Sequence, residues 1–408
     1  MRSRVFDLAT TPPLGEVPTL MHAVVVRSDR EGEPRDSMRV EEMPVPEVGP
    51  LDVLVLVMAA GVNFNGVWAA RGQPVSTMKM HPEQDFHIPG SDASGIVWKV
   101  GSAVKRWKVG DEVVLHCNQS CGECPSCNGE DPLACQNQKI WGYETNWGSF
   151  AQFCLVQSQQ LLPKPKHLSW EESASYGLTF FTAYRMLLGR ANMQPGDHVL
   201  VWGASGGLGV FAIQLCKLTG ATPIAVVSRD DKAELCRELG ADLIINRREF
   251  DFSKGPEESR RFGKKIRELT GGADPDIVFE HVGAETFPTS VLVAKKFGKI
   301  VICGATSGYK LEFDVRYLWM RQKEIVGSHF SNAFQADRAN RLIIDGRVKP
   351  VLDECFDFEE TALAHQRMAD NQHKGKMAIR VQAPRSERSP RESEEGSNRM
   401  TPWAPRAA

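Results

Sequence analysis

The chain has 408 residues, of which 42% are apolar and 25% charged, a composition typical of a soluble globular protein with roughly two to three domains. Its 49 Lys and Arg against 51 Asp and Glu leave a net charge of −2, which argues against a nucleic-acid partner or an acidic membrane surface. The longest apolar run, Val53 to Val62, is too short to span a membrane, and no apolar stretch follows Arg2 and Arg4 as in a secretory signal, so we expect a cytosolic protein.

The first part of the chain predicts a β-rich domain. Between His22 and about Val156, short β-branched runs are separated by Gly, Pro and Asp turns, as expected for strands. These runs are AVVV, VLVLV, GIVWKVG, DEVVLHC and FAQFCLV. Residues 1–20, which are rich in Pro and Thr, are interpreted as an N-terminal arm.

From Trp170 onward, helix-length segments alternate with apolar strands. The expected strands are HVLVWGA, TPIAVVS, ADLIIN, DIVFEHV and GKIVICGA, and the expected helices cover 208–219, 231–239 and 285–296. This alternation predicts the α/β class with a doubly wound parallel sheet.

The remaining sequence, from EIVGSHF to MAIRVQ, returns to mixed strand and helix. We therefore expect a β-rich domain, an inserted α/β domain and a return segment, with a ligand cleft between the two domains. From about Pro384 the chain consists mainly of Pro, Arg, Ser and Glu without periodic apolar residues, and this tail is predicted to be disordered.

A glycine-rich loop lies between the strand HVLVW and the helix that follows it. Its residues are Ala204, Ser205, Gly206, Gly207, Leu208 and Gly209. Glycines allow a tight turn and close approach of a pyrophosphate, which the free N–H groups of the helix N-terminus then bind. The loop therefore predicts a dinucleotide site; the alternative is a glycine-rich connection without a ligand.

The end of the next strand distinguishes the two nicotinamide cofactors. An NAD site places an acidic residue there for the ribose 2′-hydroxyl, whereas this strand ends in Ser228, followed by Arg229 and Lys232. A hydroxyl and two cations suit a 2′-phosphate, so we predict NADPH. Asp230 and Asp231 argue against this, unless they are the N-cap and first-turn acids of the next helix.

Five of the ten cysteines fall between Cys117 and Cys135, which in a reducing compartment favours metal over disulfides. Four of them have the spacing Cys-x2-Cys-x2-Cys-x7-Cys: Cys121, Cys124, Cys127 and Cys135. Four thiolates on one short loop predict a closed structural zinc site; the alternative is a loop of reduced cysteines without metal. No second ligand set accompanies His81 or His87, so we expect the substrate to be polarised without a metal.

The two-domain order, the glycine loop and the four-cysteine lobe resemble the medium-chain dehydrogenase/reductase superfamily. The resemblance implies a GroES-like catalytic domain over 21–165 and 325–383, with the zinc lobe at about 117–136. It also implies a Rossmann NADPH-binding domain over 166–324, and the composition of residues 384–408 predicts the disordered tail that follows.

Two departures separate this chain from the zinc alcohol dehydrogenases of that superfamily. Those enzymes have Gly-His-Glu where this chain has Gly90-Ser91-Asp92, and a catalytic Cys near the position of Val62-Asn63. The resemblance therefore does not extend to a zinc-dependent alcohol dehydrogenase activity.

More specific segments resemble the crotonyl-CoA carboxylase/reductases. They are VNFNGVW (62–68), IWGYET (140–145), LLPKPKHLSWEESA (161–174), WGASGGLG (202–209), RFGKKIRELTGG (261–272), DIVFEHVG (276–283), RYLWM (316–320) and GSHF (327–330). That family reduces α,β-unsaturated acyl-CoA with NADPH and traps the enolate with CO2 as an alkylmalonyl-CoA, for carbon assimilation or as a polyketide extender unit. The resemblance implies the same reaction, on crotonyl-CoA or a longer enoyl-CoA, and a homodimer or homotetramer.

The resemblance also implies site residues. Asn65 and His329 would contact the CO2 oxygens, Glu144 would organise water and His329, and Tyr143 would form an apolar wall. Arg316 would bind a phosphate of CoA. Compared with better-known members, this chain has a short segment (PVSTMKMHPEQDF) after the Asn65 region and keeps the cysteine lobe, so the acyl-chain preference does not transfer.

Each of these residues also has a structural alternative. Asn65 could cap a turn, Glu144 could lie on the surface, His329 could pack in a strand, and Arg316 could stack on neighbouring aromatic residues. Two other functions stay open: an enoyl-CoA or quinone reductase that ends in protonation, and a non-catalytic NADPH-binding sensor or interaction module.

Overall fold

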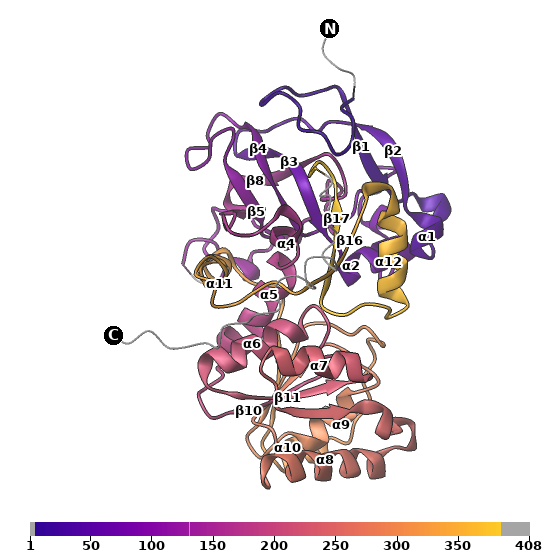
Figure 1. Cartoon of the computed structure of the whole chain (residues 1–408), viewed down its shortest axis with the longest axis vertical. Helices are drawn as coiled ribbons and strands as arrows, with labels where there is room; N and C mark the ends of the chain where they lie inside the picture. Colours follow the sequence, from indigo (N-terminus) through magenta and orange to yellow (C-terminus); the bar gives the residue numbers. More distant parts are fainter. Residues whose placement is uncertain (1–4, 130, 385–408) are drawn as a thin grey trace, which may run out of the picture.

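The computed structural model describes residues 5–129 and 131–384, so nearly all of the predicted disordered tail lies outside the described residues. The chain forms two lobes, with both ends of the sequence contributing to the upper lobe in Figure 1 and the middle forming the lower lobe. No helix in the described ranges is long and apolar enough to cross a membrane.

The first lobe contains a seven-stranded sheet in the order β16-β17-β3-β4-β5-β9, with β8 also paired to β3. Its strands are β3 (Asp52–Gly61), β4 (Ala93–Val100), β5 (Glu112–Leu115), β8 (Phe153–Gln157), β9 (Leu161–Pro163), β16 (Leu352–Phe356) and β17 (Lys376–Arg380). Strand β3 is continuously apolar because both of its faces are buried. Val53, Val55 and Val57 pack into one core cluster, whereas Leu54 and Leu56 pack into another.

Two outer segments complete this lobe. Strands β1 (Leu20–Val25) and β2 (Arg39–Pro44) form an antiparallel pair. Within the predicted N-terminal arm, Phe6 is buried, and its carbonyl accepts a hydrogen bond from the Gln152 amide at 2.9 Å. This part of the arm is therefore attached to the β-rich lobe.

The second lobe contains a six-stranded parallel sheet in the order β12-β11-β10-β13-β14-β15. The strands are β10 (His198–Val201), β11 (Thr222–Val227), β12 (Leu243–Asn246), β13 (Ile277–Glu280), β14 (Lys299–Ile302) and β15 (Glu324–Gly327). The order reverses between β10 and β13, which confirms the predicted doubly wound α/β architecture. Because β15 pairs with β14, this sheet extends three residues past the expected domain boundary at residue 324.

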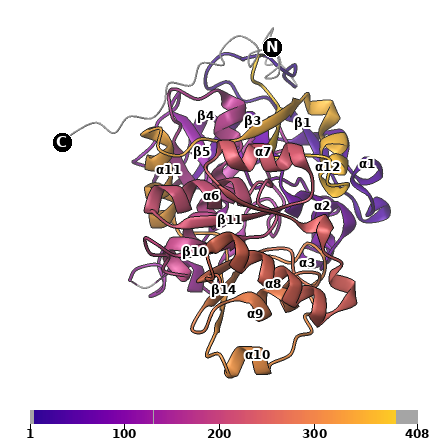
Figure 2. The same cartoon turned by 60° about the horizontal axis from the view of Figure 1, so that its bottom comes forward.

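Helices cover both faces of the parallel sheet. Figure 2 shows α6 (Gly209–Thr219) and α7 (Asp230–Glu238) on the side of the first lobe, and α8 (Pro256–Thr270) and α9 (Phe287–Val293) on the opposite side. The first two agree with the predicted helices, whereas α9 is shorter than predicted because the backbone becomes extended at Ala294 (ψ 139°).

The two lobes meet along the return segment. Helix α11 (Ala333–Ile344) packs on α5 (Gly177–Tyr184), and the Tyr176 hydroxyl donates to the Asn340 side chain at 2.6 Å. The amide of Gly375, just before β17, donates to the Ser205 carbonyl at 2.7 Å. The last strand of the first lobe is thereby joined directly to the glycine loop of the second.

Candidate active site

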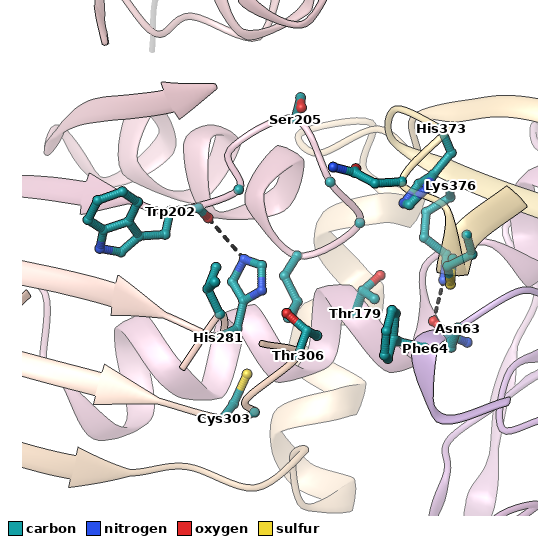
Figure 3. Close-up of a pocket in the computed structure, with 18 of the residues that line it drawn as sticks. Asn63, Phe64, Thr179, Trp202, Ser205, His281, Cys303, Thr306, His373 and Lys376 are labelled. Carbon is teal, nitrogen blue, oxygen red and sulfur yellow. Dashed lines mark hydrogen bonds between the residues drawn. The ribbon is translucent and has the colours of Figure 1, made fainter. Parts of the chain in front are cut away.

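A cavity of about 550 Å³ lies between the lobes, at the carboxyl ends of β10, β11, β13 and β14. This is the position at which open parallel sheets bind ligands. Residues of both lobes line it: Asn63 and Asn65 from the first, and the glycine loop and Ser228 from the second. Figure 3 shows this wall, with Trp202 and His281 at one end and Asn63 and Lys376 at the other.

The glycine loop turns sharply between β10 and α6. Ser205, Gly206, Gly207 and Leu208 line the cavity, whereas Ala204 and Gly209 are buried behind them. A Cβ atom at Gly209 would lie 2.5 Å from the Ala204 backbone, so no larger residue fits where the helix begins. The loop thus presents backbone and the start of α6 to the cavity, as a pyrophosphate requires.

Two of the three residues predicted to bind a 2′-phosphate line the cavity. They are Ser228, which follows β11, and Lys232, which is 5% exposed. Burial lowers the pKa of Lys232. Arg229 is the exception, because its guanidinium is held by Asp231 at 3.0 Å and does not line the cavity. Arg229 is also the N-cap of α7, so the N-cap interpretation of Asp230 is wrong and only its place in the first turn holds.

The structure brings Asn65 and His329 into the wall of this same cavity. Asn65 lies on α2 (Phe64–Arg71), where its side-chain amide donates to the Ser91 hydroxyl at 2.7 Å. His329 follows β15, and its ring lies 4.4 Å from that of Phe330. Burial lowers the pKa of His329, so the imidazole is neutral at pH 7.

Glu144 and Tyr143 lie outside the cavity wall. Glu144 accepts a hydrogen bond from the Ile140 amide at 2.7 Å, and its carbonyl accepts one from His81 at 2.5 Å. Its charge nevertheless acts to raise the pKa of His329, so it lies near that ring. The Tyr143 hydroxyl donates to the Gln73 carbonyl at 2.7 Å, and burial raises its pKa to about 12.

Arg316 is separate from the cavity. It begins the short exposed helix α10 (Arg316–Trp319) and forms an ion pair with Asp314 at 2.6 Å. The next residue, Tyr317, accepts a hydrogen bond from Arg260 at 3.1 Å and borders a hollow of about 150 Å³. The charged residues lining this hollow are Arg260, Arg267, Asp274, Lys296, Arg321 and Lys323. Cations therefore predominate beside α10.

A buried ion pair, absent from the predicted site, lies under the glycine loop. The Lys376 ammonium is 3.7 Å from the Asp92 carboxylate and donates to the Val62 carbonyl at 2.9 Å and to the Asn63 side chain. Burial raises the pKa of Asp92 to about 6 and lowers that of Lys376 to about 8. The departures at Asn63 and Asp92 from the zinc alcohol dehydrogenase pattern were the sequence signal for it.

His281 is a second cavity residue that the sequence analysis did not identify. It follows β13 and donates to the Trp202 carbonyl at 2.9 Å. Behind it the buried Glu280 carboxylate accepts hydrogen bonds from the Val282 amide at 2.8 Å and the Ser290 hydroxyl at 2.6 Å. This carboxylate fixes the turn that carries His281.

The four cysteines of the zinc prediction lie together, with all four Sγ atoms within 4.8 Å of one another. Their hydrogen-bonded Sγ pairs are separated by 3.5, 3.6 and 3.9 Å. Thiolates about 2.3 Å from a tetrahedral zinc lie roughly 3.8 Å apart. The donor set and spacing therefore fit zinc, at a distance from the cavity wall.

Comparison with known proteins agrees with this arrangement. Residues 49–166 match the alcohol dehydrogenase GroES-like domain, and residues 207–343 match the zinc-binding dehydrogenase family. A crotonyl-CoA carboxylase/reductase of Cereibacter sphaeroides is 52% identical over 94% of this chain and 92% of its own length. A crotonyl-CoA reductase of Streptomyces collinus is 46% identical, covering 90% of this chain and 89% of its own.

Solved structures extend the similarity. A crotonyl-CoA carboxylase/reductase structure, 50% identical, aligns with a TM-score of 0.89 over 98% of this chain and 97% of its own. A 2-octenoyl-CoA carboxylase reductase in complex with NADP and 2-octenoyl-CoA, 41% identical, aligns with a TM-score of 0.87 over 91% and 89%. With identity this high across nearly its whole length, the chain belongs to the crotonyl-CoA carboxylase/reductase family of the medium-chain dehydrogenase/reductase superfamily.

Proposed function

We propose that this protein reduces an α,β-unsaturated acyl-CoA with NADPH and carboxylates the product to an alkylmalonyl-CoA. One observation carries the proposal: Asn65 and His329 line the same cavity as the glycine loop, Ser228 and Lys232. A CO2 molecule held by the first two would therefore lie in the space that also receives the nicotinamide. Relatives whose structures contain NADP support the choice of cofactor.

When bound, NADPH supplies a hydride for the β-carbon of the substrate. The chain's own residues then determine whether the resulting enolate reacts with CO2 or with a proton. The Asn65 amide and the neutral His329 imidazole each have an N–H to donate to a CO2 oxygen, which orients an uncharged, linear molecule toward the α-carbon. Both lie in a wall formed by the two lobes, and a substrate bound between the lobes would displace water that could otherwise protonate the enolate.

Glu144 acts in this scheme as a positioning residue for His329. Its negative charge acts to raise the pKa of His329, against the effect of burial, and its own carboxylate is anchored by the Ile140 amide. Tyr143 would shape the wall behind it.

The CoA moiety is assigned to the surface around α10. Arg316 lies there beside the hollow with a predominance of Arg and Lys, and guanidinium groups bind phosphate in a bidentate manner. Engagement of a phosphate would require Arg316 to exchange its ion pair with Asp314.

We further propose that Cys121, Cys124, Cys127 and Cys135 bind one structural zinc. Four protein ligands leave no position for substrate, so the zinc would stabilise the lobe. The Asp131 carboxylate, in the same loop, pairs with Arg185 at 2.7 Å and links the lobe to the helical region at the cavity.

The assembly is proposed to be a homodimer formed along β15, with a homotetramer of two such dimers as the alternative. Strand β15 ends the parallel sheet, and its outer edge has no partner among the described residues. Ile325, on this strand, is an apolar residue that is 40% exposed. A second copy would pair the edge and cover this side chain.

The alternative function is the same reduction ending in protonation. Tyr143 and Glu144 lie outside the cavity wall, and the Streptomyces collinus relative is named a crotonyl-CoA reductase. In that case the product would not depend on CO2.

The test is NADPH oxidation by the purified full chain with crotonyl-CoA and with 2-octenoyl-CoA, each with and without bicarbonate, followed by mass spectrometry of the thioesters. A product heavier by one carboxyl group only with bicarbonate is expected. Butyryl-CoA or octanoyl-CoA under both conditions would establish the alternative. Tight NADPH binding without turnover of either substrate would favour a sensor or interaction module.

A further inference from the structure

One turn of the first lobe forms part of the cavity wall on the side of the second lobe. It connects α12 (Thr361–Ala369) to β17, and Asn371, His373 and Gly375 from this turn line the cavity together with Ser228 and Lys232. Figure 3 shows His373 beside Lys376, across the glycine loop from Trp202. The residues predicted to bind a 2′-phosphate therefore have neighbours from the opposite lobe.

The turn is held in place by contacts on both sides. Asn371 adopts a left-handed conformation (φ 55°) at the end of α12, and its side-chain oxygen accepts a hydrogen bond from Lys232 at 3.1 Å. The Lys374 amide donates to the Asp353 carboxylate at 3.2 Å, and the Gly375 amide donates to Ser205 at 2.7 Å. His373 is thus presented to the cavity by an anchored backbone.

The surroundings of His373 are cationic. Lys232, Lys376 and Arg229 all act on its ring, and together with burial they lower its pKa to about 4. Two carboxylates also lie nearby. Asp231 forms an ion pair with Arg229, and Asp353 interacts electrostatically with Lys232 and Arg229. Asp353 also accepts the hydrogen bond from the Lys374 backbone amide. Neither ring nitrogen of His373 has a hydrogen-bond partner within the described ranges, and Nδ1 is buried. An imidazole without a partner among three cations is an arrangement that an anion would complete.

We propose that His373 is a specificity-determining residue that contacts the 2′-phosphate of NADPH from the opposite lobe, completing the subsite begun by Ser228 and Lys232. The inference rests on the proposed NADPH dependence. The phosphate dianion would add negative charge beside Lys232, whose hydrogen-bond partner is the neutral Asn371 side chain, and the imidazole supplies an N–H donor. NADH has a hydroxyl in place of this phosphate and gains little from the same contact.

The pyrophosphate, which NADH and NADPH share, is the other phosphate that could lie here. Two observations favour the 2′-phosphate over the pyrophosphate. Ser228 and Lys232 follow β11, where the adenosine ribose binds in this fold, and Lys232 contacts the same turn through Asn371. The backbone N–H groups at the start of α6 are the expected binding site of the pyrophosphate.

The test compares wild type, His373→Ala and the more conservative His373→Gln as full-length proteins. The Kd of each is measured for NADPH and NADH, and also for adenosine 2′,5′-bisphosphate and 5′-AMP, which isolate the 2′-phosphate without a pyrophosphate. We expect His373→Ala to weaken NADPH and the bisphosphate by about 10-fold, as for loss of a charge-assisted hydrogen bond, and to leave NADH and 5′-AMP within about twofold. His373→Gln, which keeps an N–H donor, should lose less.

The control is His167→Ala, since His167 is exposed and does not line the cavity; its four Kd values should match wild type. Equal weakening of NADPH and NADH would overturn the proposal in favour of a pyrophosphate contact, and unchanged binding of both would reduce His373 to a structural role. If His373→Ala does not fold, judged by its circular dichroism, His373→Gln decides by the same ratio. A wild type that prefers NADH would instead contradict the proposed function, which separates the two failures.

Discussion

The ammonium of Lys376 lies 3.7 Å from the carboxylate of Asp92, and each of the two side chains is 1% exposed. Burying two charges is costly unless nearby polar groups compensate for the lost water. Asn63 bridges the pair, since its side-chain oxygen accepts a hydrogen bond from Lys376 and its amide donates to Asp92 Oδ2 at 3.3 Å, whereas Asp92 Oδ1 has no hydrogen-bond partner among the described residues. A Cβ at Gly207 would lie 2.8 Å from the Lys376 Cδ, so this network supports the glycine loop from below.

The pair predicts strongly non-additive stability effects. Lys376→Met leaves a buried carboxylate without its cation, and Asp92→Asn leaves a buried ammonium without its anion, so each should lower the free energy of unfolding by about 3 to 5 kcal/mol. The double variant should lose less than the sum because it buries neither charge. Urea denaturation of the four proteins measures this coupling. Additive losses would show that the two charges do not interact.

A pH dependence of stability follows from the same pair. Burial raises the pKa of Asp92 from 3.8 to about 6. Between these two pH values the folded chain keeps a proton that the unfolded chain releases, so the free energy of unfolding falls as the pH rises from 3.8 to about 6. Burial lowers the pKa of Lys376 from 10.5 to about 8, so the unfolded chain binds the extra proton and stability rises between these values. Relative to the double variant, the wild type should be least stable between pH 6 and 8, which urea titrations at about pH 5, 7 and 9 would detect. A constant difference across the three would contradict it.

Asn65→Ala and His329→Ala should change the product more than the rate of NADPH oxidation. Each removes one proposed donor to CO2 while leaving the glycine loop intact, so the ratio of ethylmalonyl-CoA to butyryl-CoA from crotonyl-CoA should fall by about 10-fold or more. Mass spectrometry of the thioesters, with bicarbonate present, gives the ratio. His167→Ala is the control and should keep the wild-type ratio, whereas an unchanged ratio in both site variants would remove these residues from CO2 binding.

The cysteine lobe should contain one zinc per chain. Cys124→Ser should abolish it and lower the Tm, because the loop loses its cross-link, while the Kd for NADPH stays within about twofold. Elemental analysis and thermal melts measure both. The control Cys355→Ser changes a half-buried cysteine outside the cluster and should keep the metal. Wild-type protein that contains no zinc after purification would refute the assignment.

Charge placed at the β15 edge should dissociate the proposed dimer. Ile325→Lys introduces like charges from two copies into the paired edges, so the mass from light scattering should fall to that of one chain. Leu363→Lys, at an exposed apolar residue of α12 in the first lobe, should leave the mass unchanged. A wild type with the mass of one chain would contradict the assembly.

Local features of this protein were accessible from its sequence. Strand β10, the glycine loop and α6 are consecutive in the chain, so apolar periodicity and glycine spacing were sufficient to predict the dinucleotide site. The four cysteines lie within one loop for the same reason. Asn65 and His329 were predicted as CO2-site residues from the family resemblance alone. Nothing in their immediate sequence distinguishes a substrate-binding side chain from a packed one.

The tertiary structure decided which distant residues share a wall. Lys376 contacts Asn63, 313 residues earlier, and His373 faces Lys232 from the other lobe, contacts that local patterns do not encode. Arg229 forms an ion pair with Asp231, a contact that depends on side-chain geometry, and its binding of phosphate stays a prediction. The sequence alone determined the elements and the loop chemistry, which depend on neighbours in the chain. Only folding, which brings the return segment against the parallel sheet, determined the charges around the cavity.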